Sequence, residues 1–231
     1  MIKLYLLRHG ETVYNVQEIV QGWNDSPLTS LGIYQAKCTG YGMRNTVFTK
    51  AFSGDSARQI NTAEVFMKEN KCSVEIVADQ RLREMCFGEY EYGTYVEMLE
   101  PIYRKFNSVY EGHDGLYKYL DEFGIDSELY HYDETGKYEG IERLWGRLSN
   151  ILNEICENYD DGNILISTSS FAINTILLKL FPDHKLNGLV SNASITEILY
   201  DGSFHLLDLD NIEYRKNGEQ HYSFKSLADK L

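Results

Sequence analysis

The chain has 231 residues, of which 43% are hydrophobic and 25% are charged, as in globular domains with a sizeable core. Its 35 acidic and 22 basic side chains give a net charge of −13, which disfavours nucleic acids and anionic membranes as partners because both repel an acidic surface. No apolar run reaches the ~18 residues that a membrane-spanning helix needs, and the four cysteines form no C-x-x-C pair, so we expect a cytoplasmic protein with free thiols.

Short apolar runs alternate with segments of helical periodicity along the chain. The apolar runs predict strands at 3–7, 51–53, 74–77 and 163–167, and then a hairpin of strands at 195–200 and 204–209. The periodic segments predict a helix capped by Thr29 and further helices over 55–69, 139–159 and 169–181. Strands that alternate with helices predict an α/β fold of three layers (α/β/α) around a mostly parallel central sheet, as a single domain over residues 1–231.

The composition and the periodicity of the sequence change between about residues 89 and 139. Tyrosines crowd into this segment, acidic residues outnumber basic ones, and clean periodicity is lost. We therefore expect a helical, tyrosine-rich lid insertion that covers the site and does not belong to the sheet.

Polar side chains stand where three of the predicted strands end. Arg8 and His9 follow the first strand, Ser53 ends the second and Thr168 follows the strand at 163–167. Ligands of such sheets bind outside the carboxyl ends of the strands. A guanidinium matches phosphate oxygens, and an imidazole nitrogen is a nucleophile near neutral pH. Because the chain is acidic, an anionic substrate binds only where basic groups are concentrated, and this edge of the sheet is such a place.

Several motifs follow one another along the chain. They are Arg8-His9-Gly10-Glu11-Thr12, Asn15, Gln21-Gly22, Asp25-Ser26-Pro27-Leu28-Thr29, Gly32, Gln35-Ala36, the run 53–63, Leu82-Arg83-Glu84, Phe87-Gly88-Glu89 and Asn192-Ala193-Ser194-Ile195. In order and spacing they resemble the histidine phosphatase superfamily, which has the phosphoglycerate-mutase-like fold. The motifs span most of the chain outside the tyrosine-rich segment.

The resemblance implies a role for each matched residue. His9 is expected to attack phosphorus and carry the phosphoryl group as a phosphohistidine. Arg8 and Arg58 are expected to hold the phosphate oxygens, and Glu84 to act first as general acid and then as general base. Contacts with phosphate or substrate are implied for Arg8, Asn15, Gln21, Gly22, Arg58, Thr168 and Ser169. No metal and no other cofactor is expected.

One departure from the family pattern concerns the chemistry directly. A second catalytic histidine, followed by two glycines, is expected after the strand at 163–167, where this chain has Thr168-Ser169-Ser170. Threonine offers one neutral hydrogen bond and no charge, and the loss of one such donor typically costs about 10²–10³ in rate. His113 and His131, both in the insertion, are candidates to replace the missing histidine.

The sequence thus predicts a phosphomonoesterase that acts through a phosphohistidine on a small phosphorylated metabolite, weakly or with narrow specificity. The alternative is a degenerate relative that binds a phosphorylated ligand or a protein partner without turning it over. A phosphoglycerate mutase is less favoured, because Gln35-Ala36 resembles the phosphatase branch and the insertion offers few basic groups for a second phosphate. The sequence does not specify the substrate or the oligomeric state.

Overall fold

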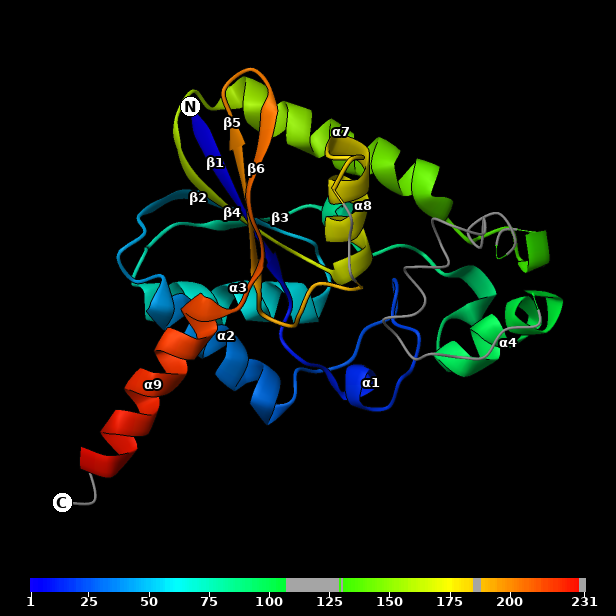
Figure 1. Ribbon diagram of the computed structural model, residues 1–231, viewed down its shortest axis with the longest axis horizontal. Coiled ribbons are helices and arrows are strands. Elements are labelled where there is room, and N and C mark those ends of the chain that lie inside the picture. The colour runs from blue at the N-terminus through cyan, green and yellow to red at the C-terminus, as the bar shows by residue number, and fades with distance from the viewer. Residues whose placement is uncertain (107–128, 130, 185–187, 229–231) are drawn as a thin grey trace.

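The computed structural model describes residues 1–106, 129, 131–184 and 188–228, and it contains a central sheet flanked by helices (Figure 1). The strand order in the sheet is β3-β2-β4-β1-β5-β6. The strands are β1 (Ile2–Arg8), β2 (Phe48–Ser53), β3 (Ile76–Ala78), β4 (Gly162–Thr168), β5 (Ile195–Tyr200) and β6 (Phe204–Asn211). Neighbouring strands from β3 to β1 are parallel, whereas β5 and β6 add an antiparallel edge, so the prediction of a mostly parallel α/β sheet is confirmed.

Helices cover both faces of the sheet. The helices in the described part of the chain are α1 (Val13–Val16), α2 (Ser30–Gly42), α3 (Ala57–Asn70), α4 (Tyr95–Phe106), α7 (Gly140–Asn158), α8 (Ser170–Leu180), α9 (Glu213–Ala228) and the short 3-10 helices η1 (Gln80–Leu82) and η2 (Gly88–Tyr90). Helices α2, α3 and α9 pack together on one side, and α7 and α8 on the other (Figure 1). None of the described helices is both long enough and apolar enough to cross a membrane.

The side chains of β1 show how one strand supplies both layers of the core. Leu4 and Leu6 join the cluster built with α7 and α8, whereas Tyr5 and Leu7 join the cluster that contains Phe66 of α3. This division follows from the two-residue period of a strand, which points successive side chains to opposite faces. A strand buried on both faces is largely apolar, as this one is from Leu4 to Leu7. Lys3, near its start, is only half-buried and pairs with Glu197.

Most of the predicted elements are confirmed within a few residues. Thr29 caps α2 as expected, because its side chain accepts a hydrogen bond from the backbone nitrogen of Gly32. The third strand lies at Ile76–Ala78, slightly later than predicted. Helix α9 was not predicted, because its sequence is mostly polar and carries no clear apolar stripe.

The predicted insertion at about 89–139 lies partly outside the described residues. Its described beginning contains helix α4, and two of its tyrosines, Tyr95 and Tyr138, are buried in the core cluster with α7 and α8. The helical character is therefore confirmed for α4. The extent of the insertion as a lid stays a prediction.

A pair of glycines tests how closely α9 packs on α2. A Cβ atom at Gly218 of α9 would overlap the backbone of Cys38 in α2, whereas a Cβ atom at Gly146 of α7 would meet nothing within 4 Å. We expect Gly218→Ala to lower the free energy of unfolding by about 1–3 kcal/mol through overpacking. Gly146→Ala, the matched control, should raise it by about 0.5–1 kcal/mol because alanine is the better helix former. Urea unfolding measures both, and equal effects would contradict the described packing.

Candidate active site

The carboxyl ends of β1 and β4 bring the two halves of the predicted site together. Arg8 and Thr168 are direct neighbours in the parallel pairing of these strands. Just beyond, the backbone nitrogen of His9 donates to the carbonyl oxygen of Thr168 at 3.0 Å. The position at which the resemblance calls for a second histidine therefore lies beside His9, as the sequence pattern implied.

His9 is buried and oriented by the backbone of the next residue. Its Nδ1 lies 2.8 Å from the carbonyl oxygen of Gly10. Because a carbonyl oxygen can only accept, Nδ1 carries the hydrogen and Nε2 keeps its lone pair. Burial, together with the positive charges of Arg58 and Arg8, holds the pKa of His9 well below its usual range. The imidazole is thus neutral at physiological pH, which is the form a nucleophile requires.

Arg58 is fully buried, and oxygens of the loop before α2 hold it in place. Its Nη1 donates to the carbonyl oxygen of Asn24 at 2.8 Å and to Oδ1 of Asp25 at 3.0 Å, and its Nη2 donates to the carbonyl oxygen of Gly22 at 2.8 Å. The buried Nε has no hydrogen-bond partner among the described residues. A fixed guanidinium with an unused N–H group is suited to bind an anion.

Gly22 lets this loop approach closely enough to hold the arginine. A Cβ atom there would overlap the carbonyl oxygen of Met85 and a carboxylate oxygen of Glu91. That carboxylate in turn accepts hydrogen bonds from the backbone nitrogens of Trp23 and Asn24 at 2.8 and 2.7 Å. Gly22 therefore acts through its carbonyl on Arg58, and its predicted contact with substrate stays a prediction.

Arg8 and Asn15 are both tied to the segment that precedes β5. The Nη1 of Arg8 donates to the carbonyl oxygen of Val190. The Oδ1 of Asn15 accepts from the backbone nitrogen of Thr12 at 3.1 Å and from Nδ2 of Asn192 at 3.3 Å. Because both partners are donors, the oxygen of the Asn15 amide is identified and its NH₂ group remains to donate. This orientation fits the uncharged phosphate donor that was predicted.

Glu84 is buried against the first turn of α8. Its Oε1 accepts from the backbone nitrogens of Met85 at 2.8 Å and Ala172 at 3.1 Å, and its Oε2 accepts from that of Phe171 at 3.0 Å. Burial raises the pKa of Glu84, while these N–H groups and the charges of Arg58 and Arg147 act in the opposite direction. A carboxyl group with a raised pKa keeps its proton to higher pH, as a general acid requires.

Arg147 of α7 holds the segment that carries Glu84, and the sequence did not reveal this role. Its Nη1 donates to the carbonyl oxygens of Arg81 at 2.9 Å and Arg83 at 2.6 Å, and its Nη2 donates to that of Glu84 at 2.7 Å. Glu139 pairs with the same guanidinium at 2.6 Å. Glu84 is thereby fixed to α7 as well as to α8.

Tyr95, at the start of α4, is buried, as are Arg8, His9, Arg58 and Glu84. We call these five residues the buried cluster. Burial and the negative charge of Glu84 raise the pKa of Tyr95, while the charges of Arg8 and Arg58 act in the opposite direction. The charges that act on this hydroxyl are those of the predicted catalytic residues. The sequence placed Tyr95 in the tyrosine-rich insertion without a role.

The residues that replace the expected His-Gly-Gly make internal hydrogen bonds. Thr168 is fully buried and its hydroxyl donates to the carbonyl oxygen of Leu82 at 2.6 Å, so its single hydroxyl hydrogen is used within the protein. The Oγ of Ser169 accepts from Nε2 of Gln59 at 2.8 Å. Their predicted contacts with phosphate stay predictions, and in this arrangement both side chains brace the loops around the cluster.

Two further predicted side chains lie away from the cluster or hold its surroundings. Gln21 links Thr12 and Ser26, accepting from the first hydroxyl at 2.7 Å and donating to the second at 3.1 Å. His131 is exposed and packs edge-on against Tyr132, apart from the buried cluster. His113 lies outside the described residues.

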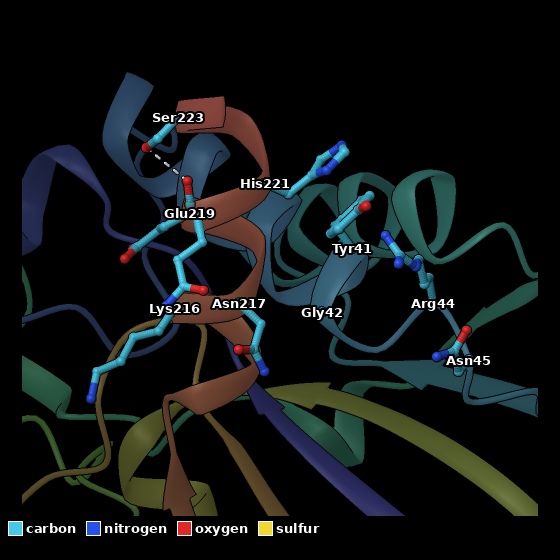
Figure 2. A pocket seen from close by; sticks show the side chains of 10 residues that line it. Tyr41, Gly42, Arg44, Asn45, Lys216, Asn217, Glu219, His221 and Ser223 are labelled. Carbon is cyan, nitrogen blue, oxygen red and sulfur yellow. Dashed lines mark hydrogen bonds between the residues drawn. The ribbon is translucent and has the colours of Figure 1, made fainter. Parts of the chain in front are cut away.

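Two cavities adjoin α9, and only one contains predicted site residues. The larger, about 1030 Å³, lies between the end of α2 and α9, where His221 stacks on Tyr41 and Arg44 lies just beyond (Figure 2). No predicted site residue lines it. The smaller, about 410 Å³, is lined by Arg8, Asn15, Gln35, Leu189, Ser191, Asn192 and Arg215. Of these two cavities, the smaller one is therefore the candidate for the substrate site.

Sequence comparison identifies relatives of the chain. A model of the histidine phosphatase superfamily (branch 1) matches residues 4–212. The probable phosphoglycerate mutase GpmB of Proteus mirabilis (strain HI4320) is 40% identical over 91 residues, which are 39% of this chain and 41% of that protein. The match thus spans about two fifths of the curated relative.

Solved structures extend the likeness to nearly the whole chain. A phosphoglycerate mutase from Bacillus anthracis str. Sterne superimposes with a TM-score of 0.85 and 28% identity, over 94% of this chain and 96% of that one. A phosphoserine phosphatase from Entamoeba histolytica, in complex with 3-phosphoglyceric acid, superimposes with a TM-score of 0.67 and 23% identity, over 93% of this chain and 100% of that one. The second likeness establishes the fold alone.

Proposed function

The chain belongs to the histidine phosphatase superfamily, and on this premise we propose that it hydrolyses phosphate monoesters of small metabolites through a phosphohistidine at His9. The observation that carries this proposal is the neutral, buried imidazole with its Nε2 lone pair available, next to the charges of Arg8 and Arg58. Phosphatase and mutase structures among the relatives support a phosphorylated substrate. A cytoplasmic location and the absence of nucleic-acid or membrane partners stay predictions.

In the first step Nε2 of His9 attacks phosphorus, and the bond from phosphorus to the ester oxygen breaks. Arg8, Arg58 and the amide of Asn15 hold the phosphoryl oxygens, on which negative charge is spread in the transition state. Glu84 donates its proton to the departing oxygen, so the leaving group departs as a neutral alcohol. Oε2 accepts one backbone hydrogen bond and Oε1 accepts two, so Oε2 is the oxygen with room for the proton.

In the second step a water molecule attacks the phosphohistidine. The Glu84 carboxylate accepts a proton from this water, the bond from phosphorus to Nε2 breaks, and inorganic phosphate leaves. His9 returns to its neutral form and Glu84 to its protonated form. The backbone N–H groups that hold Glu84 keep it in place while its charge changes.

A second candidate function is binding without turnover. The Thr168 hydroxyl, which stands where the family has a histidine, already donates to Leu82 and carries no charge. A site with this change retains its arginines and binds anions, but it has one charged donor fewer for the transition state. Turnover measurements separate this candidate from the first.

Substituting the nucleophile tests the proposed activity. We expect the protein to hydrolyse p-nitrophenyl phosphate at mildly acidic to neutral pH, and His9→Ala to lower kcat by at least about 10³-fold because no other group forms the intermediate. The matched control is His205→Ala, since His205 is exposed on β6 and pairs with Asp201. Turnover that survives in His9→Ala would refute the phosphohistidine route, and saturable phosphate binding without turnover in the native protein would favour the binding function.

The leaving group reveals whether Glu84 is the acid. For an alkyl phosphate, we expect Glu84→Gln to lower kcat/KM by about 10²–10⁴-fold, because an alkoxide is a poor leaving group without a proton. For p-nitrophenyl phosphate the loss should be much smaller, since p-nitrophenolate needs no proton. Because burial raises the pKa of Glu84, native kcat/KM for the alkyl ester should fall as the pH rises through that pKa.

The control for this experiment is Glu100→Gln, which changes an exposed carboxylate on α4 that pairs with Arg104. Equal losses for the alkyl and aryl esters in Glu84→Gln would assign Glu84 a purely structural role at the start of α8.

A further inference from the structure

The cavity of about 410 Å³ differs in charge from the rest of the protein. Its described lining includes two arginines, Arg8 and Arg215, but no aspartate or glutamate, although the chain carries 35 acidic and 22 basic residues. Arg8 comes from the end of β1, and Arg215 from the first turn of α9. The cavity thus continues from the buried cluster toward α9, on a path that includes no described residue of the predicted lid.

Two side-chain amides in the lining are oriented by backbone N–H groups that bind their oxygens, so that their NH₂ groups are identified. The Oε1 of Gln35 accepts from the backbone nitrogen of Glu11 at 3.0 Å, and the oxygen of Asn15 accepts from the backbone nitrogen of Thr12. A backbone N–H group can only donate, so these contacts identify the oxygens and leave the NH₂ groups for a ligand. The lining therefore offers N–H donors from the guanidinium of Arg215 and from two amides, beside the positive charge of Arg8.

Arg215 is held in place with part of its guanidinium unused. Its Nη1 donates to the carbonyl oxygen of Asn192 at 2.8 Å, and its Nε lies 3.5 Å from Oε1 of Glu219. Its Nη2 makes no hydrogen bond with the described residues. The side chain of Asn192 donates to the carbonyl oxygen of His9 at 3.0 Å, so one residue links Arg215 to the nucleophile's backbone.

We propose that Arg215 and Gln35 form a subsite for a second anionic group of the substrate, while Arg8 and Asn15 hold the phosphoryl group that is transferred. The second group is a carboxylate or another phosphate, since a guanidinium fork binds the oxygens of either. This inference rests on the proposed function and names the substrate class as a phosphate monoester with an additional negative charge on its alcohol part.

Binding to a His9→Ala background tests the subsite without turnover. The probes are 3-phosphoglycerate, glycerol 3-phosphate, in which a hydroxymethyl group replaces the carboxylate, and glycerol 1,3-bisphosphate. We expect Arg215→Met to weaken calorimetric binding of a probe with two anionic groups, 3-phosphoglycerate or glycerol 1,3-bisphosphate, by about 10–100-fold, as for the loss of a charge-assisted hydrogen bond. Binding of glycerol 3-phosphate should change by less than about twofold. The first and third probes distinguish a carboxylate from a second phosphate.

The controls separate this role from folding and from general charge. Lys216→Met removes the neighbouring cation on α9, which pairs with Glu213 and does not line this cavity, and it should leave all three affinities unchanged. Arg215→Lys keeps the charge but not the fork and should lie between the native residue and methionine. If Arg215→Met weakened the binding of all three probes equally, or if the protein with Arg215 bound the probes with two anionic groups no better than glycerol 3-phosphate, the subsite would be overturned.

The outcomes also separate this inference from the proposed function. If the selectivity appears but the native protein hydrolyses no phosphate ester, the proposed function fails and the subsite stands. If the native protein hydrolyses phosphate esters through His9 but Arg215→Met shows no selectivity, the subsite fails and the function stands.

Discussion

The catalytic end of this protein depends on burying the charge of Arg58. An ion removed from water is stable only if other groups replace its hydration, and here carbonyl oxygens of Gly22 and Asn24 and the Asp25 carboxylate do so. Those oxygens converge because the Glu91 carboxylate binds the backbone nitrogens of the same loop. The loop, the arginine and the neutral state of His9 are therefore consequences of one arrangement.

The positive charges of Arg8 and Arg58 also explain how an acidic chain is able to bind an anionic substrate. Burial lowers the pKa of His9, and the positive charges of Arg58 and Arg8 lower it further, because a third positive charge beside two others is unfavourable. On the proposed function a bound phosphoryl group offsets this repulsion. The arginines thus favour the unprotonated imidazole that the proposal needs, and they are the groups proposed to bind the phosphoryl group.

The missing second histidine changes the support of the site as well as its charge. Thr168 donates to the carbonyl oxygen of Leu82, and Arg147 donates to those of Arg83 and Glu84. The consecutive carbonyls of residues 82–84 are thereby fixed from β4 and α7. On the proposed route the phosphoryl group has one donor fewer, which should lower the rate, while the segment that carries Glu84 gains a hydrogen bond from Thr168.

The sequence revealed the elements and residues whose signal is local. The apolar run of β1 ending at Arg8, the cap at Thr29 and the position of Thr168 beside His9 all followed from pattern and resemblance. Arg147 and Tyr95 did not, because their roles arise from contacts with residues far away in the chain. Helix α9 has no clear apolar stripe and was not predicted, so the sequence did not indicate that Arg215 lies beside the site. Contacts to backbone carbonyls leave no mark in composition or periodicity.

The central claim is that His9 carries the phosphoryl group. The most direct test is rapid quenching of the native protein into alkali during turnover of p-nitrophenyl phosphate, because phosphohistidine survives base, followed by mass spectrometry of the intact chain and its peptides. The account predicts one phosphoryl group per chain, on His9, formed as fast as the first p-nitrophenolate is released and absent from His9→Ala. Turnover without this adduct, or an adduct on another residue, would contradict it.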